Sequence, residues 1–274
     1  ALVAIDGKTL RSSYDREDRT STIHMVSAYA AANKLVLGQI KTDAKSNEIT
    51  AIPELLALLD IKGCLVSIDA MGCQTEIAET ILQQGGDYLL AVKGNQPKLF
   101  EAVRQALAPL AATPLCAETM TLEKAHGRID GREYHVMAAG ELAAQFPHWK
   151  QLHSIGVAIS YRVENMQKIT IEQRYFISSK ALVQDEFARA VRGHWAIENS
   201  LHWVLDVTMG EDDCPIYRGD AAEILACIRH MGLNMLRAET SRKASVRRKQ
   251  KIAGMSSEYL ETVLNAGLKK LGEI

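Results

Sequence analysis

The 274-residue sequence lacks any pairing pattern among its few cysteines. The five cysteines are odd in number and none forms a C-x-x-C pair, which argues against a disulfide framework and a zinc knuckle and is typical of reduced thiols. The sequence also lacks an apolar run long enough to cross a bilayer, and its start does not resemble a signal peptide. We therefore expect a cytoplasmic protein with no membrane partner.

Excess charge of one sign is absent as well. The chain has 32 basic and 33 acidic residues, so any binding to nucleic acid must come from locally grouped charge. One such group lies at 241–251, where six residues are Lys or Arg and none is acidic. Hydrophobic residues make up 47% of the chain, which is enough for a full core.

The sequence opens on Ala1, followed at once by the strand-like run 2–5. Natural termini usually carry a few loose polar residues. We therefore expect a fragment whose N-terminal part is absent.

Strand and helix signals alternate over the first hundred residues. Short apolar runs predict strands, and apolar residues at helical spacing predict helices. The expected strands are 1–6, 21–32, 35–41, 64–68 and 88–92, and the expected helices are 48–60, 74–84 and one ending near 108. This alternation predicts a mixed α/β sheet covered by helices.

The pattern changes beyond this region. Strand signals at 119–122, 133–138, 154–163 and 169–178, separated by turns at 127–131 and 164–165, predict an antiparallel β unit that projects from the core. Helices are expected at 184–206 and 219–239. We divide the chain into the first part of the core (1–112), a β-rich insertion (113–179), a helical completion of the core (180–240) and a basic tail with a helix (241–274).

Two acids follow apolar strands. Asp6 and Asp69 each end such a run, and ligands of open α/β sheets gather at the carboxyl ends of strands. A carboxylate there is costly unless it is paired or binds a cation. Ordinary turn chemistry explains the pair Asp6-Gly7 equally well.

A third acid lies on the expected helix 184–206. His194, Glu198 and His202 are spaced i, i+4, i+8, which places them on one stripe of a regular α-helix. Ile197 and Leu201 belong to the neighbouring face, which would pack on the sheet. Polar residues at the edge of the core are the alternative. A zinc site is less favoured because the spacing is no standard zinc motif.

Several further residues are candidate phosphate contacts. Lys93 and Asn95 follow a strand, with plain turn duty as an equal alternative. Arg128 and Arg132 lie in the expected turn region, where solvated surface is somewhat favoured. The basic group at 241–251 includes Arg247, Arg248 and Lys249, and such groups often serve only solubility.

Two tryptophans and one group of acids have structural interpretations. Trp195 and Trp203 are expected in the core. The acids at 211–213 are expected to be exposed where the helix closes.

Six phrases in order carry a family resemblance. They are residues 4–11 (AIDGKTLR), 67–74 (SIDAMGCQ), 91–96 (AVKGNQ), 126–128 (HGR), 174–179 (RYFISS) and 194–203 (HWAIENSLHW). They resemble the H-repeat-associated family of DDE-type insertion-sequence transposases, from residue 1 to about 240. The resemblance implies a ribonuclease-H-like mixed sheet flanked by helices, with a β-rich insertion before the last catalytic helix.

The resemblance also implies an activity. Asp6, Asp69 and Glu198 would be the catalytic carboxylates and the ligands of two Mg²⁺ or Mn²⁺ ions, which cleave DNA strands and transfer them. The implied partner is double-stranded DNA, both transposon ends and target, with nucleoid association when bound. A homodimer is left open.

This sequence departs from better-known relatives, which carry a Y-(2)-R-(3)-E-(6)-K signature around the glutamate. Val191, His194 and Leu205 stand where the Tyr, Arg and Lys would be. His194 and His202, with Arg192 nearby, are expected to replace the missing phosphate contacts. Full-length members also carry a segment before the first strand, which we expect to help bind DNA.

Three functions therefore compete: an active transposase, a structure-specific nuclease without strand transfer, and an inactive remnant that acts only as a DNA-binding or structural protein. Metal titration and plasmid nicking separate the enzymes from the remnant, and joining of donor ends separates the two enzymes.

Overall fold

The computed structural model describes residues 1–15, 17–18, 22–42, 48–111, 121–125, 128–164 and 168–271. The chain forms two compact units. The first unit comprises Ala1–Ile5 and Asp60–Trp195, and the second comprises Asp6–Leu59 and Ala196–Ile274. Each unit is described in turn.

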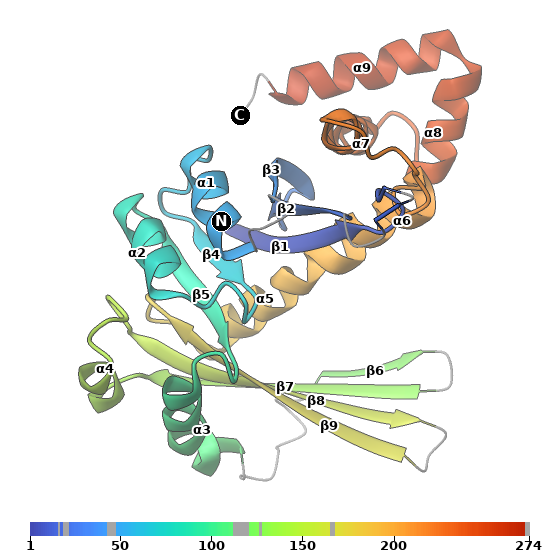
Figure 1. Ribbon diagram of the computed structural model, residues 1–274. Coiled ribbons are helices and arrows are strands. Elements are labelled where there is room, and N and C mark those ends of the chain that lie inside the picture. Colours follow the sequence, from blue (N-terminus) through green and yellow to red (C-terminus); the bar gives the residue numbers. More distant parts are fainter. Residues whose placement is uncertain are drawn as a thin grey trace. The chain divides into compact units, whose positions relative to one another are not determined.

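The sheet of the first unit is mixed. The start of β1 (Leu2–Leu10) pairs in parallel with β4 (Leu65–Ile68), from Leu2 opposite Leu65 to Ile5 opposite Ile68. The order continues β4-β5-β9-β8-β7-β6, with β4 and β5 parallel and every later pair antiparallel. These strands are β5 (Asp87–Val92), β6 (Thr121–Ala125), β7 (Arg128–Ala138), β8 (Ser154–Glu164) and β9 (Lys168–Ser178). Strands β7, β8 and β9 are the long neighbouring arrows in Figure 1.

Helices of the first unit bury apolar faces. They are α2 (Thr75–Gln83), α3 (Pro97–Ala111), α4 (Glu141–Gln145) and α5 (Gln184–Ala196). Phe187 of α5 stands edge-on to Tyr134 and Phe176, with ring centroids 6.3 and 5.5 Å away. A Cβ at Gly156 of β8 would lie 2.6 Å from the Phe187 ring. Glycine at 156 is therefore what lets α5 approach the sheet.

The second unit contains an antiparallel hairpin and most of the helices. The hairpin strands β2 (Ile23–Ala30) and β3 (Leu35–Lys41) lie in the order β3-β2-β1. The helical elements are α1 (Glu48–Ala57), the π-helix η1 (Ile197–His202), α6 (Trp203–Met209), α7 (Ala221–Ala238), α8 (Val246–Met255) and α9 (Ser257–Leu271). Leu10, Ile23 and Met25 pack with Ala222 and Ala226 of α7.

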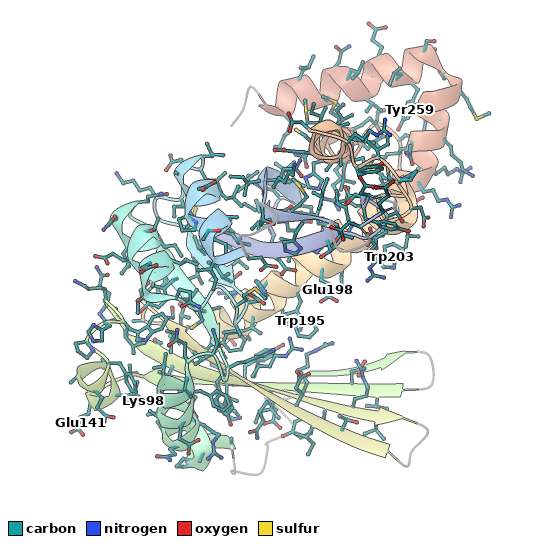
Figure 2. The ribbon with its side chains drawn as sticks, in the orientation of Figure 1. Lys98, Glu141, Trp195, Glu198, Trp203 and Tyr259 are labelled. Atoms are coloured by element: carbon teal, nitrogen blue, oxygen red, sulfur yellow. The ribbon has the colours of Figure 1, made fainter. Side chains whose placement is uncertain are left out.

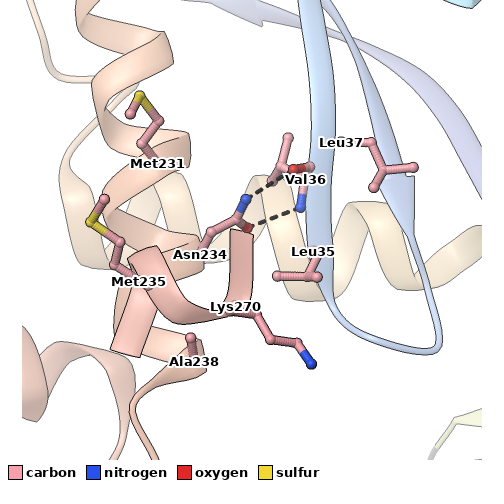
Figure 3. Close-up of a pocket in the computed structure, with 9 residues that line it drawn as sticks. Leu35, Val36, Leu37, Met231, Asn234, Met235, Ala238 and Lys270 are labelled. Atoms are coloured by element: carbon pink, nitrogen blue, oxygen red, sulfur yellow. Dashed lines mark hydrogen bonds between the residues drawn. The ribbon is translucent and has the colours of Figure 1, made fainter. Parts of the chain in front are cut away.

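The outermost strand of this hairpin is held by a side chain. Asn234 of α7 accepts a hydrogen bond from the Val36 backbone N–H at 3.0 Å and donates one to the Val36 carbonyl at 2.9 Å (Figure 3). The amide thus satisfies a peptide group that a sheet edge would otherwise expose. Beside it is a cavity of 270 Å³ lined by residues of β3, α7 and α9, among them Leu35, Leu37 and Met231.

The predicted fold class is confirmed: a mixed sheet flanked by helices, with a β-rich segment before the glutamate-bearing helix. None of the described helices is long and apolar enough to cross a membrane. The β-rich segment is antiparallel as predicted, and β9 joins it to β5 in one sheet. The start of its first predicted strand, at 119–120, lies outside the described residues. The division at 112, 179 and 240 stays a prediction.

Two local expectations were wrong. Strand β1 does not end at Asp6 but continues to Leu10, because its parallel pairing with β4 stops at Ile5 while β2 remains its neighbour. The expected turn at 127–131 is mostly strand, because β7 begins at Arg128 and pairs there with Ala125 of β6 and Glu164 of β8. Arg128 and Arg132 therefore lie within β7.

Candidate functional site

In the first unit, Asp69 follows the last residue of β4. Its Oδ1 accepts hydrogen bonds from the backbone N–H groups of Met71 at 3.0 Å and Gly72 at 3.3 Å. The Asn95 amide, on the loop after β5, donates to the Ala70 carbonyl at 2.6 Å. This hydrogen bond joins the loop after β5 to the loop after β4. The Asp69 carboxylate is therefore oriented by backbone N–H groups, and the Asn95 amide fixes the residue that follows it.

His194, on α5, lies next to the strand β4 that precedes this loop. Its Nδ1 lies 3.0 Å from Ser67 Oγ, two residues before Asp69 on β4. Burial lowers the pKa of His194 to about 4, so the ring is neutral at pH 7. The neighbouring Trp195 is covered by the guanidinium of Arg174, 4.1 Å from the ring centroid. His194 therefore lacks the positive charge that the expected phosphate contact requires.

In the second unit, the two faces of β1 meet different partners. On one face His24 Nε2 lies 2.6 Å from Glu48 Oε1, and both atoms crowd Gly7. A Cβ there would lie 2.4 Å from His24 Nε2 and 2.0 Å from the Glu48 oxygen. Glycine after Asp6 is thus explained by close approach of two side chains and not by a turn.

The other face of β1 carries Asp6. Its Oδ1 accepts a hydrogen bond from the Gly7 N–H at 3.0 Å, and its Oδ2 lies 3.6 Å from His202 Nδ1. His202 is buried, and burial, followed by the nearby charge of Lys8, lowers its pKa to about 4. A neutral, buried imidazole is not suited to the phosphate contact expected of His202. The ring lies beside the first candidate carboxylate instead.

Two residues along the same face, Lys8 enters a cluster of acids. Its Nζ donates to Asp206 and to Glu211 Oε2 at 2.6 Å, and lies 3.5 Å from Asp212 Oδ1. The Lys8 side chain is 10% exposed and that of Glu211 only 2%. Burial alone would lower the pKa of Lys8, but Glu211 and Asp206 raise it above its ordinary value. The lysine therefore remains a buried cation.

Glu198, labelled in Figure 2, lies on η1. The helix is locally wound as a π-helix there. A π-helix has more residues per turn than an α-helix, so the expected stripe of His194, Glu198 and His202 does not form as predicted. Ile197, Leu201 and His202 are buried, whereas Glu198 is exposed. π-Bulges of this kind are frequent at functional sites.

Two further expectations for this region were wrong. Trp203 was expected in the core but is 58% exposed. Glu211 was expected among exposed acids but is buried against Lys8. The π-turn shifts the helical phase at Trp203, which directly follows it, and sequence periodicity gives no sign of such a turn. The burial of Glu211 accompanies its pairing with Lys8.

The other candidate DNA contacts lie on several elements. Lys93, Arg192, Arg247 and Arg248 are exposed, the last two on α8, whose first turn is capped by Ser245. The side chain of Arg128 lies outside the described residues. Lys249 is buried, with its Nζ 3.1 Å from Glu239 Oε2. Its ammonium group also donates to the Leu236 and Glu239 carbonyls, so it is directed into the protein and away from solvent.

The donors fit a hard divalent cation in kind, since Asp6, Asp69 and Glu198 offer carboxylate oxygens. Asp6 and Asp69 are each held by backbone N–H groups. Over the described ranges, no group of three or more His, Cys, Asp or Glu side chains is arranged to hold a metal.

Sequence reasoning missed Lys8 and the role of Glu211. One signal was available, because alternation along a strand places Asp6 and Lys8 on the same face once β1 is extended. Ser67 was also missed. The same alternation would have placed it on the face of β4 that leads to Asp69.

Comparisons with known proteins identify the family of this chain. The family described as "Transposase DDE domain" matches residues 1–235. The protein YbfL of Escherichia coli (strain K12) is 49% identical, and the H repeat-associated protein YhhI of the same strain is 48% identical. Each alignment covers 96% of this chain and 71% of the relative.

Among solved structures, the chain resembles a piggyBac transposase in a synaptic complex with hairpin DNA. The TM-score is 0.50 and the identity 12%, over 99% of this chain and 54% of that one. At this identity the likeness shows a shared fold.

Proposed function

The chain belongs to the transposase DDE domain family, and on that premise we propose that it cleaves DNA strands in a metal-dependent reaction and transfers the ends of an insertion element into a target. Asp6, Asp69 and Glu198 are the proposed catalytic carboxylates and the ligands of two Mg²⁺ or Mn²⁺ ions. Double-stranded DNA is the proposed partner, as element ends and as target.

The register of β1 and β4 is the observation that carries the proposal. Ile5 lies opposite Ile68 in parallel strands. Asp6 follows Ile5 within β1, and Asp69 follows Ile68 directly after the end of β4. Each of these two proposed ligands therefore directly follows the carboxyl end of a segment that is paired in parallel, Leu2–Ile5 or Leu65–Ile68. Asp6 also contacts His202, which lies on η1 with Glu198.

Each residue has a chemical task in this proposal. Bound divalent ions would activate the attacking oxygen and stabilise the leaving oxygen of the phosphodiester. Backbone N–H groups orient the two aspartates, and neutral His202 lies beside Asp6 without adding charge. Exposed Lys93, Arg192, Arg247 and Arg248, with Arg128 and Arg132, are the proposed contacts to DNA phosphates.

The test is a supercoiled plasmid that carries the element's ends, incubated with the chain and Mg²⁺ or Mn²⁺. We expect nicking that requires metal, and joining of pre-cut ends to a second plasmid. Asp6→Asn, Asp69→Asn and Glu198→Gln should each abolish both. Asp213→Asn, a matched change at an exposed acid, should alter neither.

Other outcomes assign other functions. Nicking without end joining would indicate a nuclease. Binding to DNA without nicking would indicate an inactive remnant, and both results would contradict the proposed strand transfer.

A further inference from the structure

Two side-chain links connect β1 to the helical segment that follows Glu198. Asp6 Oδ2 lies 3.6 Å from His202 Nδ1, and Lys8 Nζ donates a hydrogen bond to Asp206. All four residues belong to the second unit. Two residues along a strand advance by about 6.6 Å, and four residues along an α-helix by about 6 Å. The spacing i, i+2 on the strand therefore matches the spacing i, i+4 on the helix.

Lys8 supplies the buried positive charge of this contact, and exposed Arg11 adds a second cation 3.3 Å from Asp212 Oδ2. Between Glu198 and Met209 the chain has no Lys or Arg. The acids of the cluster, Asp206, Glu211 and Asp212, all lie within 3.5 Å of the ammonium group. A charge that is shared among three carboxylates and 10% exposed is poorly placed to bind a phosphate.

We propose that Lys8 is a positioning residue that clamps the strand carrying Asp6 to the helical segment carrying Glu198, through Asp206 and Glu211. The inference rests on the proposed function, because it concerns the placement of two of the proposed metal ligands. A displacement of about 1 Å at a reacting centre can cost about a hundredfold in rate. The clamp thus acts on the reaction step while leaving DNA binding unchanged.

The first experiment compares Lys8→Met, Lys8→Arg and the wild-type chain. Lys8→Met should slow plasmid nicking about a hundredfold or more while the dissociation constant for a duplex stays within about twofold. Lys8→Arg should recover most of the rate, because a guanidinium also forms strong hydrogen bonds to carboxylates. A loss of duplex affinity that parallels the loss of nicking would overturn the proposal, since Lys8 would then contact DNA.

A matched control separates positioning from stability. Glu239 and Lys249 form another buried lysine–glutamate pair in the same unit, at 3.1 Å. Glu239→Gln breaks that pair and should lower the unfolding midpoint comparably, yet keep nicking within about threefold. If Glu239→Gln slows nicking as much as Lys8→Met does, Lys8 has only a structural role and the proposal fails.

A double variant covers the case in which Lys8→Met does not fold. Glu211 would be left as a buried, unpaired charge, which is strongly destabilising. Lys8→Met with Glu211→Gln removes that charge, so this chain should fold and still nick about a hundredfold more slowly than wild type. Wild-type nicking by the double variant would contradict the clamp.

Measurements of the unfolding midpoint also distinguish a failure of the clamp from a failure of the proposed function. If the wild-type chain does not nick DNA, the proposed function fails, and the midpoint still tests the clamp. Glu211→Gln should lower the midpoint in the wild-type background and raise it in the Lys8→Met background. A change of the same sign in both backgrounds would show that Lys8 and Glu211 are not coupled.

Discussion

The two compact units hold their candidate acids by different means. In the first unit Asp69 is oriented by the backbone N–H groups of Met71 and Gly72, and the amide of Asn95 holds the neighbouring Ala70 carbonyl. In the second unit Asp6 lies beside a buried network of ions, in which Lys8 joins β1 to Asp206 and Glu211. A loop can thus be fixed by local hydrogen bonds, whereas a strand and a helix distant in sequence need side chains that link them.

The largest effect should come from the acids themselves, in both units alike. Asp69→Asn and Asp6→Asn should each lower nicking by about a thousandfold or more, because a metal ligand supplies several kcal/mol of transition-state stabilisation. Rates of nicking under single-turnover conditions check this. A much smaller effect in one unit would show that its acid is not part of the centre.

The next effect is a dependence of stability on pH, to which buried histidines in both units contribute. Burial lowers the pKa of His194 in the first unit to about 4 and that of His230 in the second to about 3. A histidine whose pKa is lower in the folded than in the unfolded state contributes its full stability at pH values above the unfolded-state pKa. This stability is lost as the pH falls towards the folded-state pKa. Between pH 6.5 and about 4, His194 should contribute a loss of about 3 kcal/mol.

Denaturant unfolding at a series of pH values measures this loss. His194→Gln should flatten the acid limb, and an exposed-site change such as Lys269→Gln should not. An unchanged slope for His194→Gln would mean that the ring is already protonated in the folded chain.

A smaller effect should come from the loop that holds Asp69. Asn95→Ala removes the hydrogen bond to the Ala70 carbonyl, and we expect about tenfold slower nicking with duplex affinity little changed. Lys93→Ala, on the same loop but exposed, should instead weaken duplex binding. If Asn95→Ala weakens binding and leaves the rate intact, Asn95 contacts DNA directly.

The smallest effect concerns α8 in the second unit. Arg247→Ala with Arg248→Ala should weaken binding to all duplexes alike and reduce the salt slope of log affinity by about 1.8, as expected for two lost phosphate contacts. A salt series with specific and random duplexes provides the measurement. An unchanged slope, or a loss confined to one sequence, would remove α8 from the DNA surface.

Much of the fold was predictable because it depends on local pattern. Strand β4 before Asp69 and helix α7 were placed within a few residues, since their apolar periodicity is strong. The π-turn at Ile197–His202 was not, because it keeps the composition of an α-helix. Glu211 was misjudged because its burial depends on Lys8, about two hundred positions away, and sequence alone does not give such a pair.

Crystals of the chain grown with Mn²⁺ would test the central claim most directly, by anomalous scattering. We expect manganese within about 2.2 Å of carboxylate oxygens from Asp6, Asp69 and Glu198, and no manganese at the Lys8 cluster. Manganese bound by Asp206 and Glu211 instead, or bound without one of the three proposed ligands, would contradict the assignment.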